Sequence, residues 1–166
     1  GAVYNALDIS SLDDKDIAYA QDNLRVLSGL YGLLRPLDLI MPYRLEMGTK
    51  INVNGYSNLY AFWGEKITKL LEEDVKEDEV LINLASNEYS KAVDLKKFKN
   101  VITPVFKDFK NGKSKVISFF AKKARGAFVR YVIKNKPKSI DDLTLFDDLG
   151  YVFSQYDSNN QLIFTR

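Results

Sequence analysis

The stretch Ser118–Lys136 constrains the fold more than any other, because its apolar residues recur with the period of an α-helix. Ser118 is typical of an N-cap, and Lys136 is followed by a proline that suits a helix end. One broad face collects apolar side chains: Phe120, Ala124, Ala127, Phe128, Tyr131 and Val132. The polar remainder is a narrow strip: Lys123, Arg130 and Lys134. We predict a mostly buried helix with a basic strip on its exposed side.

The first two turns of this helix contain cations where the helix dipole disfavours them. Lys122, Lys123 and Arg125 lie near its positive end, where each costs about 0.3–1 kcal/mol. A polyanion bound there would reverse the sign of that penalty, because free N–H groups and lysines would face phosphate together. The alternative is that the lysines extend into water from a packed helix.

Basic residues are concentrated in one part of the chain, although the net charge is only +2. Residues 91–138 contain fifteen Lys or Arg and two acids, whereas the remainder contains nine and twenty. This asymmetry predicts an electropositive surface for an anionic partner. There are two alternatives. In one, the basic face is solvated and has no partner, and in the other, its partner is an acidic protein.

Several chemistries are excluded by composition. The chain has no cysteine and no histidine, so disulfides, thiol nucleophiles, Ser-His-Asp triads and thiolate or imidazole metal sites are impossible. We expect no metal and no other cofactor. We also expect no transmembrane span and no signal peptide, because the most apolar window, Val26–Tyr43, contains charges and turn formers.

The pattern of elements predicts an α/β mixed (α+β) fold. At 166 residues, we expect one compact domain over 1–166, with a mixed sheet, two β-hairpins and packed helices. The predicted helices, besides the one above, are 13–23, 58–75 and a short one that begins at Ser139-Ile-Asp-Asp142. The predicted strands are 24–35, which enters a glycine turn, then 42–48 and 79–84. The two hairpins pair 101–109 with 114–119 around Asn111-Gly112, and 151–154 with 161–165.

A second candidate site follows the strand predicted at 79–84. Asn83, Ser86 and Glu88 come at a strand end that opens into a helix, where ligand sites are common in α/β proteins. These residues favour an enzyme acting on a nucleotide or nucleobase, with Glu88 as acid/base. The alternative is that Ser86 and its neighbour only cap a helix.

Six motifs, in order along the chain, resemble those of the YaaA peroxide-stress protein family. They are R-V-L-S-G-L-Y-G-L-L-R-P-L-D-L at 25–39, P-Y-R-L-E-M-G at 42–48, F-W-G at 62–64, I-N-L-A-S-N-E-Y at 82–89, P-V-F at 104–106 and F-A-K-K-A-R-G at 120–126. The resemblance covers nearly the whole chain. Family members are longer and start with a strand carrying an I-S-P-A-K-T-like motif. The chain therefore resembles their C-terminal two thirds.

The resemblance implies a cytoplasmic bacterial protein of the response to hydrogen peroxide. It also implies a compact mixed fold, DNA binding along a positively charged cleft, and limitation of iron-driven oxidative damage. It does not imply an enzymatic activity. Lys122, Lys123 and Arg125 match the family's A-K-K-A-R-G run.

Together, charge and resemblance predict a surface that binds the phosphates of duplex or structured DNA. Its expected residues are Lys122, Lys123, Arg125, Arg130, Lys134, Lys113 and Lys115. Tyr131 or another aromatic residue is expected to stack on exposed bases, which would favour distorted or single-stranded sites.

Overall fold

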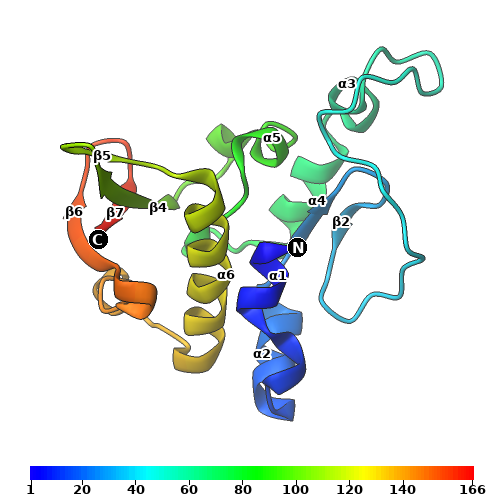
Figure 1. The fold of residues 1–166 in the computed structure, drawn as a ribbon. Helices are drawn as coiled ribbons and strands as arrows, with labels where there is room; N and C mark the ends of the chain where they lie inside the picture. The colour runs from blue at the N-terminus through cyan, green and yellow to red at the C-terminus, as the bar shows by residue number, and fades with distance from the viewer. The chain divides into compact units, whose positions relative to one another are not determined.

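The computed structural model describes residues 1–166 and has the predicted α+β architecture (Figure 1). The chain divides into two compact units, each described by itself below. The first combines Gly1–Ala20 with Ile102–Arg166, and the second is Gln21–Val101. The expectation that 1–166 form a single domain stays a prediction.

The first unit is built on a mixed sheet. Its strands are β4 (Val101–Lys110), β5 (Lys113–Lys115), β6 (Val152–Tyr156) and β7 (Gln161–Thr165). Strand β4 pairs in parallel with β7 and antiparallel with β5, and β6 pairs antiparallel with β7. The β4–β5 turn uses Asn111 and Gly112 at φ 53° and 75°, the positive values that a two-residue hairpin turn requires. Both predicted hairpins and the mixed sheet are confirmed.

Helix α6 (Ser118–Asn135) covers one face of this sheet and forms the core with it. Residues of β4 alternate between buried and half-buried as far as Asp108, so one face of the strand is packed inside. Phe106 on that face lies 5.9 Å from the ring of Phe128 in α6 and 5.4 Å from that of Phe164 in β7. Fully burying such rings stabilises the unit by about 1.5–3 kcal/mol each.

The N-terminal segment packs against α6. It contains α1 (Ala2–Leu7), η1 (Ile9–Ser11) and α2 (Asp14–Asn23), whose last residues enter the second unit. Gly126 permits the approach, because a Cβ at this position would overlap the carbonyl oxygen of Val3. Two short elements, α7 (Ile140–Leu143) and η3 (Asp148–Gly150), lead from α6 to β6.

The second unit consists of short elements around a small apolar core. These are β1 (Val26–Ser28), β2 (Gly32–Leu34), α3 (Leu59–Trp63), α4 (Lys66–Asp74), β3 (Leu81–Ile82), α5 (Asn87–Ser90) and η2 (Leu95–Lys97). Strands β1 and β2 form a hairpin across the predicted glycine turn. The buried core consists of Met47, Leu59, Ile67, Leu71, Ala92 and Val93.

Four sequence-based predictions of local structure were wrong. Residues 42–48 form no strand, because their alternating pattern has no partner strand to pair with. The helix predicted at 58–75 breaks into α3 and α4 at Gly64, which has φ 52°. The strand at 114–119 ends at Lys115, and α6 starts three residues later. Ser118 is the first residue of α6, and the N-cap is Ile117, whose side chain cannot accept a hydrogen bond.

None of the helices is both long enough and apolar enough to span a bilayer.

Candidate phosphate-binding surface

The β4–β5 hairpin places three lysines on one of its faces. Lys110 pairs with Lys113, and Asp108 pairs with Lys115. Directly paired residues share a face, and residues two apart along a strand share it too. Lys110, Lys113 and Lys115 are therefore on the face of Phe106 and Asp108, which is the face that packs on α6. Like charges directly opposite one another destabilise a hairpin, so the Lys110–Lys113 pair breaks a local rule.

The start of α6 adds two more exposed lysines, and nothing acidic offsets them. Lys122 and Lys123 are exposed, the first turn contains no acidic residue, and no side chain caps the helix. The Lys123 Nζ lies 4.6 Å from the ring centroid of Phe119. Arg125 is half-buried, and burial lowers the pKa of its guanidinium from its ordinary value. This helix end therefore presents cations and free N–H groups together.

Arg166 joins the hairpin to the start of α6. Its Nε donates a hydrogen bond to the Asp108 carboxylate at 2.6 Å, and its Nη1 donates to the carbonyl oxygen of Leu149 at 2.7 Å. The guanidinium carbon lies 4.4 Å from the ring centroid of Tyr151 and 4.8 Å from that of Phe120. Because one cation contacts both rings, it holds α6, which contains Phe120, to the segment of Tyr151 before β6. Sequence reasoning missed Arg166, because nothing near it in the chain indicates its partners.

The carboxylate of Asp108 is ionised and hydrogen-bonded inside this arrangement. Burial alone would raise its pKa, but hydrogen bonds from the Tyr151 hydroxyl and the Arg166 guanidinium outweigh burial and hold the pKa below its usual value. Burial is the main cause that raises the pKa of Tyr151, and the hydrogen bond from Tyr151 to Asp108 raises it further. The phenol therefore stays protonated. The positive charge of Arg166 is therefore balanced locally.

The other end of α6 uses its cations in packing. Arg130 Nη1 donates to the carbonyl oxygens of Leu7 and Asp8 at 3.1 Å and to the Ser11 hydroxyl at 2.8 Å. Lys134 and Lys136 both pair with the buried carboxylate of Asp16, at 3.0 and 2.8 Å. The hydrogen bond from Lys136, followed by that from Lys134, lowers the pKa of Asp16. These contacts hold α1 and α2 on α6.

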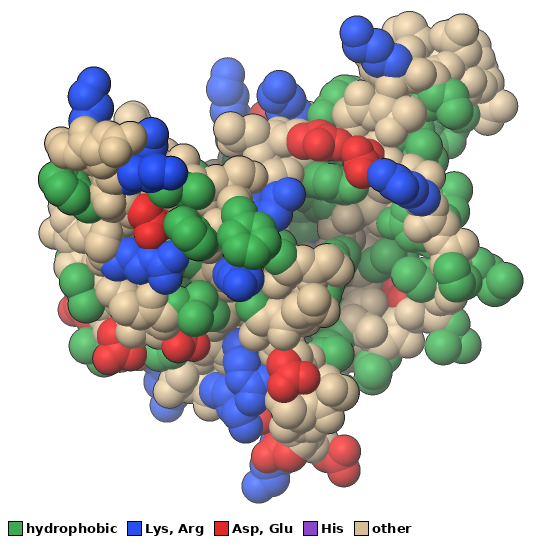
Figure 2. All heavy atoms as spheres, in the orientation of Figure 1, with side chains coloured by type: hydrophobic (Ala, Val, Ile, Leu, Met, Phe, Trp, Pro, Cys, Tyr) green, Lys and Arg blue, Asp and Glu red, His purple; other side chains and the backbone are tan.

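The predicted residues thus separate into two groups. Lys113, Lys115, Lys122, Lys123 and Arg125 lie on the β4–β5 hairpin or at the start of α6, and none of them forms an ion pair. Figure 2 shows Lys and Arg side chains over this part of the molecule, with hydrophobic side chains between them. We call these five residues, with Lys110, the basic surface. Arg130 and Lys134 lie outside it and have protein partners. Phosphate binding by all seven predicted residues stays a prediction.

Tyr131 is half-buried, and both its ring and its hydroxyl have partners in the first unit, so its stacking on a base stays a prediction. Its hydroxyl donates to the carbonyl oxygen of Asp142 at 2.5 Å, and its ring lies 6.0 Å from Phe128 and 5.6 Å from Phe146. Burial raises the pKa of this phenol. The ring packs against two buried rings of the first unit.

The second candidate site lies in the second unit, around α5. The carboxylate of Glu88 accepts a hydrogen bond from the Gly48 N–H at 2.9 Å, and the Asn83 amide oxygen accepts one from the Ala85 N–H at 3.2 Å. Ser86 is the N-cap of α5, but its hydroxyl makes no capping hydrogen bond. The catalytic role predicted for these three residues stays a prediction.

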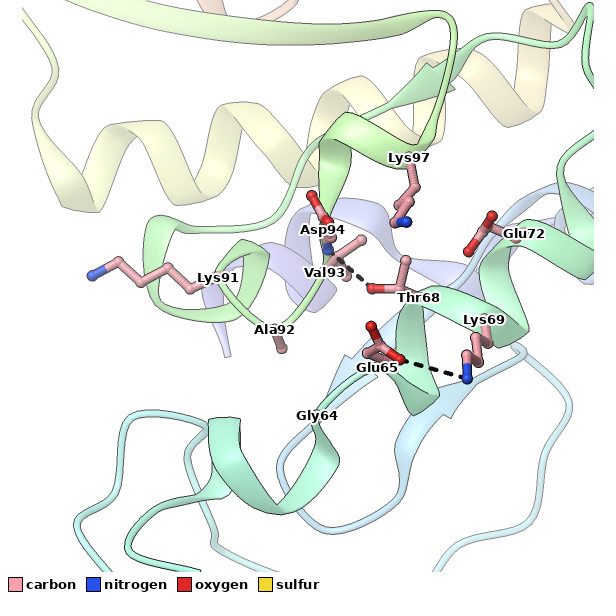
Figure 3. A pocket seen from close by; sticks show the side chains of 10 residues that line it. All are labelled: Gly64, Glu65, Thr68, Lys69, Glu72, Lys91, Ala92, Val93, Asp94 and Lys97. Atoms are coloured by element: carbon pink, nitrogen blue, oxygen red, sulfur yellow. Dashed lines mark hydrogen bonds and ion pairs between the residues drawn. The ribbon is translucent and has the colours of Figure 1, made fainter.

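A pocket of about 470 Å³ lies elsewhere in the second unit, between α4 and residues 91–97 (Figure 3). Thr68 accepts a hydrogen bond from the Asp94 N–H at 2.9 Å on its wall, and Glu65 pairs with Lys69 at 3.5 Å. Its lining contains lysines and carboxylates in similar numbers and does not include Asn83, Ser86 or Glu88. The mixed charge gives this pocket no preference for an anion.

Comparison with known proteins relates the whole chain to one family. A family model described as peroxide stress protein YaaA matches residues 1–157. A UPF0246 protein of Aliivibrio fischeri strain MJ11 is 54% identical over 170 aligned residues, and one of Saccharophagus degradans is 55% identical. A UPF0246 protein of Flavobacterium johnsoniae is 54% identical over 168. Each alignment covers 100% of this chain, but the chain spans only 66 to 67% of the length of these relatives.

Proposed function

This chain belongs to the peroxide stress protein YaaA family, and from that premise we propose that it binds DNA through the basic surface. The family places it in the response to peroxide. Its matched relatives come from bacteria. In the proposed role the protein works in the bacterial cytoplasm, and its contact with DNA helps to limit iron-driven oxidative damage there.

The observation that carries this proposal is a set of cations without acidic partners. All six of the chain's ion pairs use other residues, including Arg25, Arg35 and Arg166, and the basic surface contributes to none. Two of its features oppose local stability: the facing Lys110 and Lys113, and the lysines at the positive end of α6. Unfavourable local choices of this kind are expected where function requires them.

DNA phosphates would offset both penalties. A phosphate between the hairpin and the first turns of α6 would screen the repulsion of Lys110 and Lys113 and accept hydrogen bonds from lysine and backbone donors. Contacts to phosphate carry no sequence information, so binding is expected to be largely non-specific. Each phosphate neutralised releases counterions, and the slope of log K against log salt is about −0.9 per contact on duplex DNA.

Arg166 acts as a positioning residue in this account. Its guanidinium pairs with Asp108 and lies over the rings of Tyr151 and Phe120. It therefore adds little to the electrostatic attraction of DNA. What it supplies is a fixed geometry between the lysines of the hairpin and those of α6. Preorganised cations lose less conformational entropy when they bind than cations on independent elements do.

The test is a salt titration of DNA binding with two charge-matched variants of the full chain. One variant replaces Lys113, Lys115, Lys122 and Lys123 by Gln. The control replaces four other exposed lysines by Gln: Lys15, Lys50, Lys69 and Lys76. Both variants change the net charge by the same amount. Affinity for a labelled duplex is measured by fluorescence anisotropy from low to physiological salt.

We expect the first variant to bind at least about tenfold more weakly at low salt. Its slope should be shallower by roughly 0.9 for each lysine that contacts a phosphate. The control should keep nearly the affinity and slope of the parent chain. Equal losses in both variants would show that net charge alone governs binding and would refute a defined basic surface. An absence of DNA binding by the parent chain would refute the proposed function itself.

A further inference from the structure

Phe119 is an exposed aromatic ring inside the basic surface. It lies in the first turn of α6, and 58% of its surface is accessible. Phe120, its neighbour, is used by the fold, because its ring is covered by the Arg166 guanidinium at 4.8 Å. The two rings meet edge to face with centroids 5.9 Å apart. Phe119 is thus held in place by Phe120 but buries little of its own surface.

The cation that lies over this ring, Lys123, belongs to the basic surface. Lys123 lies four residues along α6, on the same side of the helix, with its Nζ 4.6 Å from the ring centroid of Phe119. Lys122 precedes it, and the hairpin lysines are on the face that packs on this helix. Proteins that bind single-stranded nucleic acids use this arrangement of a flat apolar ring among cations. The bases stack on the ring, and the phosphates contact the lysines.

Resting on the proposed function, we infer that Phe119 is a stacking platform for one unpaired base. The basic surface therefore prefers single-stranded or locally unpaired DNA to an intact duplex. In a duplex the base faces are covered by their neighbours, so the ring has nothing to stack on and only the lysines contribute. In a single strand the ring adds a contact that is worth roughly 5- to 150-fold in affinity.

An anionic membrane is the other surface that attracts lysines and aromatic rings, but the hairpin argues against it. A membrane anchor places its apolar side chains at the most protruding point, with its lysines behind them. Here the turn of the hairpin is Lys110-Asn111-Gly112-Lys113, and all four residues are exposed. The turn itself therefore offers acyl chains no apolar side chain.

The hairpin also supplies a matched control. Phe109 in β4 is 70% exposed, slightly more than Phe119. It pairs with Ser114, so the register puts it on the opposite face from Lys110, Lys113 and Lys115. Replacing Phe109 removes the same chemical group from the same part of the molecule, but outside the basic surface.

The experiment compares Phe119→Ala, Phe119→Trp and Phe109→Ala in the full chain. The probes are a labelled dT oligonucleotide, a labelled duplex of equal length, and vesicles containing phosphatidylserine. We expect Phe119→Ala to weaken binding of the oligonucleotide by about fivefold or more, and to change duplex affinity less than twofold, with both salt slopes unchanged. Phe109→Ala should change neither affinity. In Phe119→Trp, the added fluorescence over the Trp63 background should be quenched by the oligonucleotide.

Three results would overturn the inference while leaving the proposed function intact. They are equal losses on both DNA forms in Phe119→Ala, no loss on either, or a loss confined to vesicle binding. Failure of the proposed function itself has a different signature, because then the parent chain binds neither DNA form in a lysine-dependent way. A Phe119→Ala protein with an unchanged melting temperature would show that the helix start still folds.

Discussion

The two ends of α6 have similar numbers of cations but use them differently. At the C-terminal end, Lys134 and Lys136 converge on the single carboxylate of Asp16, and Arg130 binds backbone oxygens of the N-terminal segment. At the N-terminal end, Lys122 and Lys123 have no acidic partner. Charge on a helix is therefore informative only together with what packs beside it. One end of α6 stabilises the fold, and the other is left available for a ligand.

The largest expected effect comes from reversing the charge at the available end. In Lys122→Glu/Lys123→Glu we expect DNA affinity at low salt to fall by about a hundredfold, because two attractive contacts become repulsive. The same change favours the helix dipole and should leave the melting temperature unchanged or slightly higher. Anisotropy and thermal unfolding measure the two quantities. If the double variant bound DNA as tightly as the parent chain, the N-terminal end of α6 would not be part of the DNA-binding surface.

Gly126→Ala should break the packed part of α6 without touching its lysines. The new methyl group meets the carbonyl oxygen of Val3, a backbone atom that no rotamer change can move. Overpacking of this kind costs about 1–3 kcal/mol, and it should exceed the gain of about 1 kcal/mol from replacing glycine inside a helix. Urea unfolding should show a net loss. An increase in stability would mean that α1 does not approach α6 as closely as described.

Acid should weaken the packing at both ends of α6, because Asp16 supports one end and Asp108, through Arg166, supports the other. The pKa of Asp16 and that of Asp108 are both lower in the folded chain than the ordinary value of 3.8. The stability that these carboxylates provide is therefore fully present above that value and is lost as pH falls through the folded pKa. We expect the melting temperature to drop steeply below about pH 4. The drop should be smaller in Asp16→Asn, which lacks one of the two groups and starts from a lower stability. An equally steep drop in Asp16→Asn would show that Asp16 is not a source of the loss of stability in acid.

Ser118→Asp should produce the smallest effects, in opposite directions for folding and binding. An acid in the first turn interacts favourably with the helix dipole and with Lys122 one turn later. We expect this to raise the free energy of unfolding by about 0.3–1 kcal/mol. The same negative charge repels phosphate, so DNA affinity should fall a few-fold. Ser118→Asn is the uncharged control. A variant that gains both stability and affinity would contradict the view that this helix end is kept without an acid for phosphate.

The sequence was sufficient for the parts of the fold whose signals are local. The period of Ser118–Lys136 predicted α6, and Asn111-Gly112 predicted the β4–β5 turn. It failed where a pattern needs a distant partner. Residues 42–48 alternate like a strand, but no strand pairs with them. Gly64 ends a helix that its apolar spacing would continue, because its backbone takes a positive φ.

The candidate site was predictable in composition and not in geometry. A run of cations shows which residues are available, but Asp16 lies 120 positions before Lys136, so no local reading could pair them. Arg166 and Asp108 are 58 positions apart, and the paired guanidinium also lies over the Phe120 ring of α6. Sequence order also hides that Lys110, Lys113 and Lys115 share a face while Phe109 is on the other. Only the strand register provides that information.

The most direct test of the account compares one lysine from each end of α6. Lys123→Gln and Lys134→Gln change the charge of the same helix by the same amount, but Lys134 pairs with Asp16 and Lys123 has no acidic partner. The measurement is the slope of log K against log salt for duplex DNA. We predict that Lys123→Gln makes the slope shallower by about 0.9, whereas Lys134→Gln leaves it as in the parent chain. Equal slopes in the two variants, or a change confined to Lys134→Gln, would contradict the account.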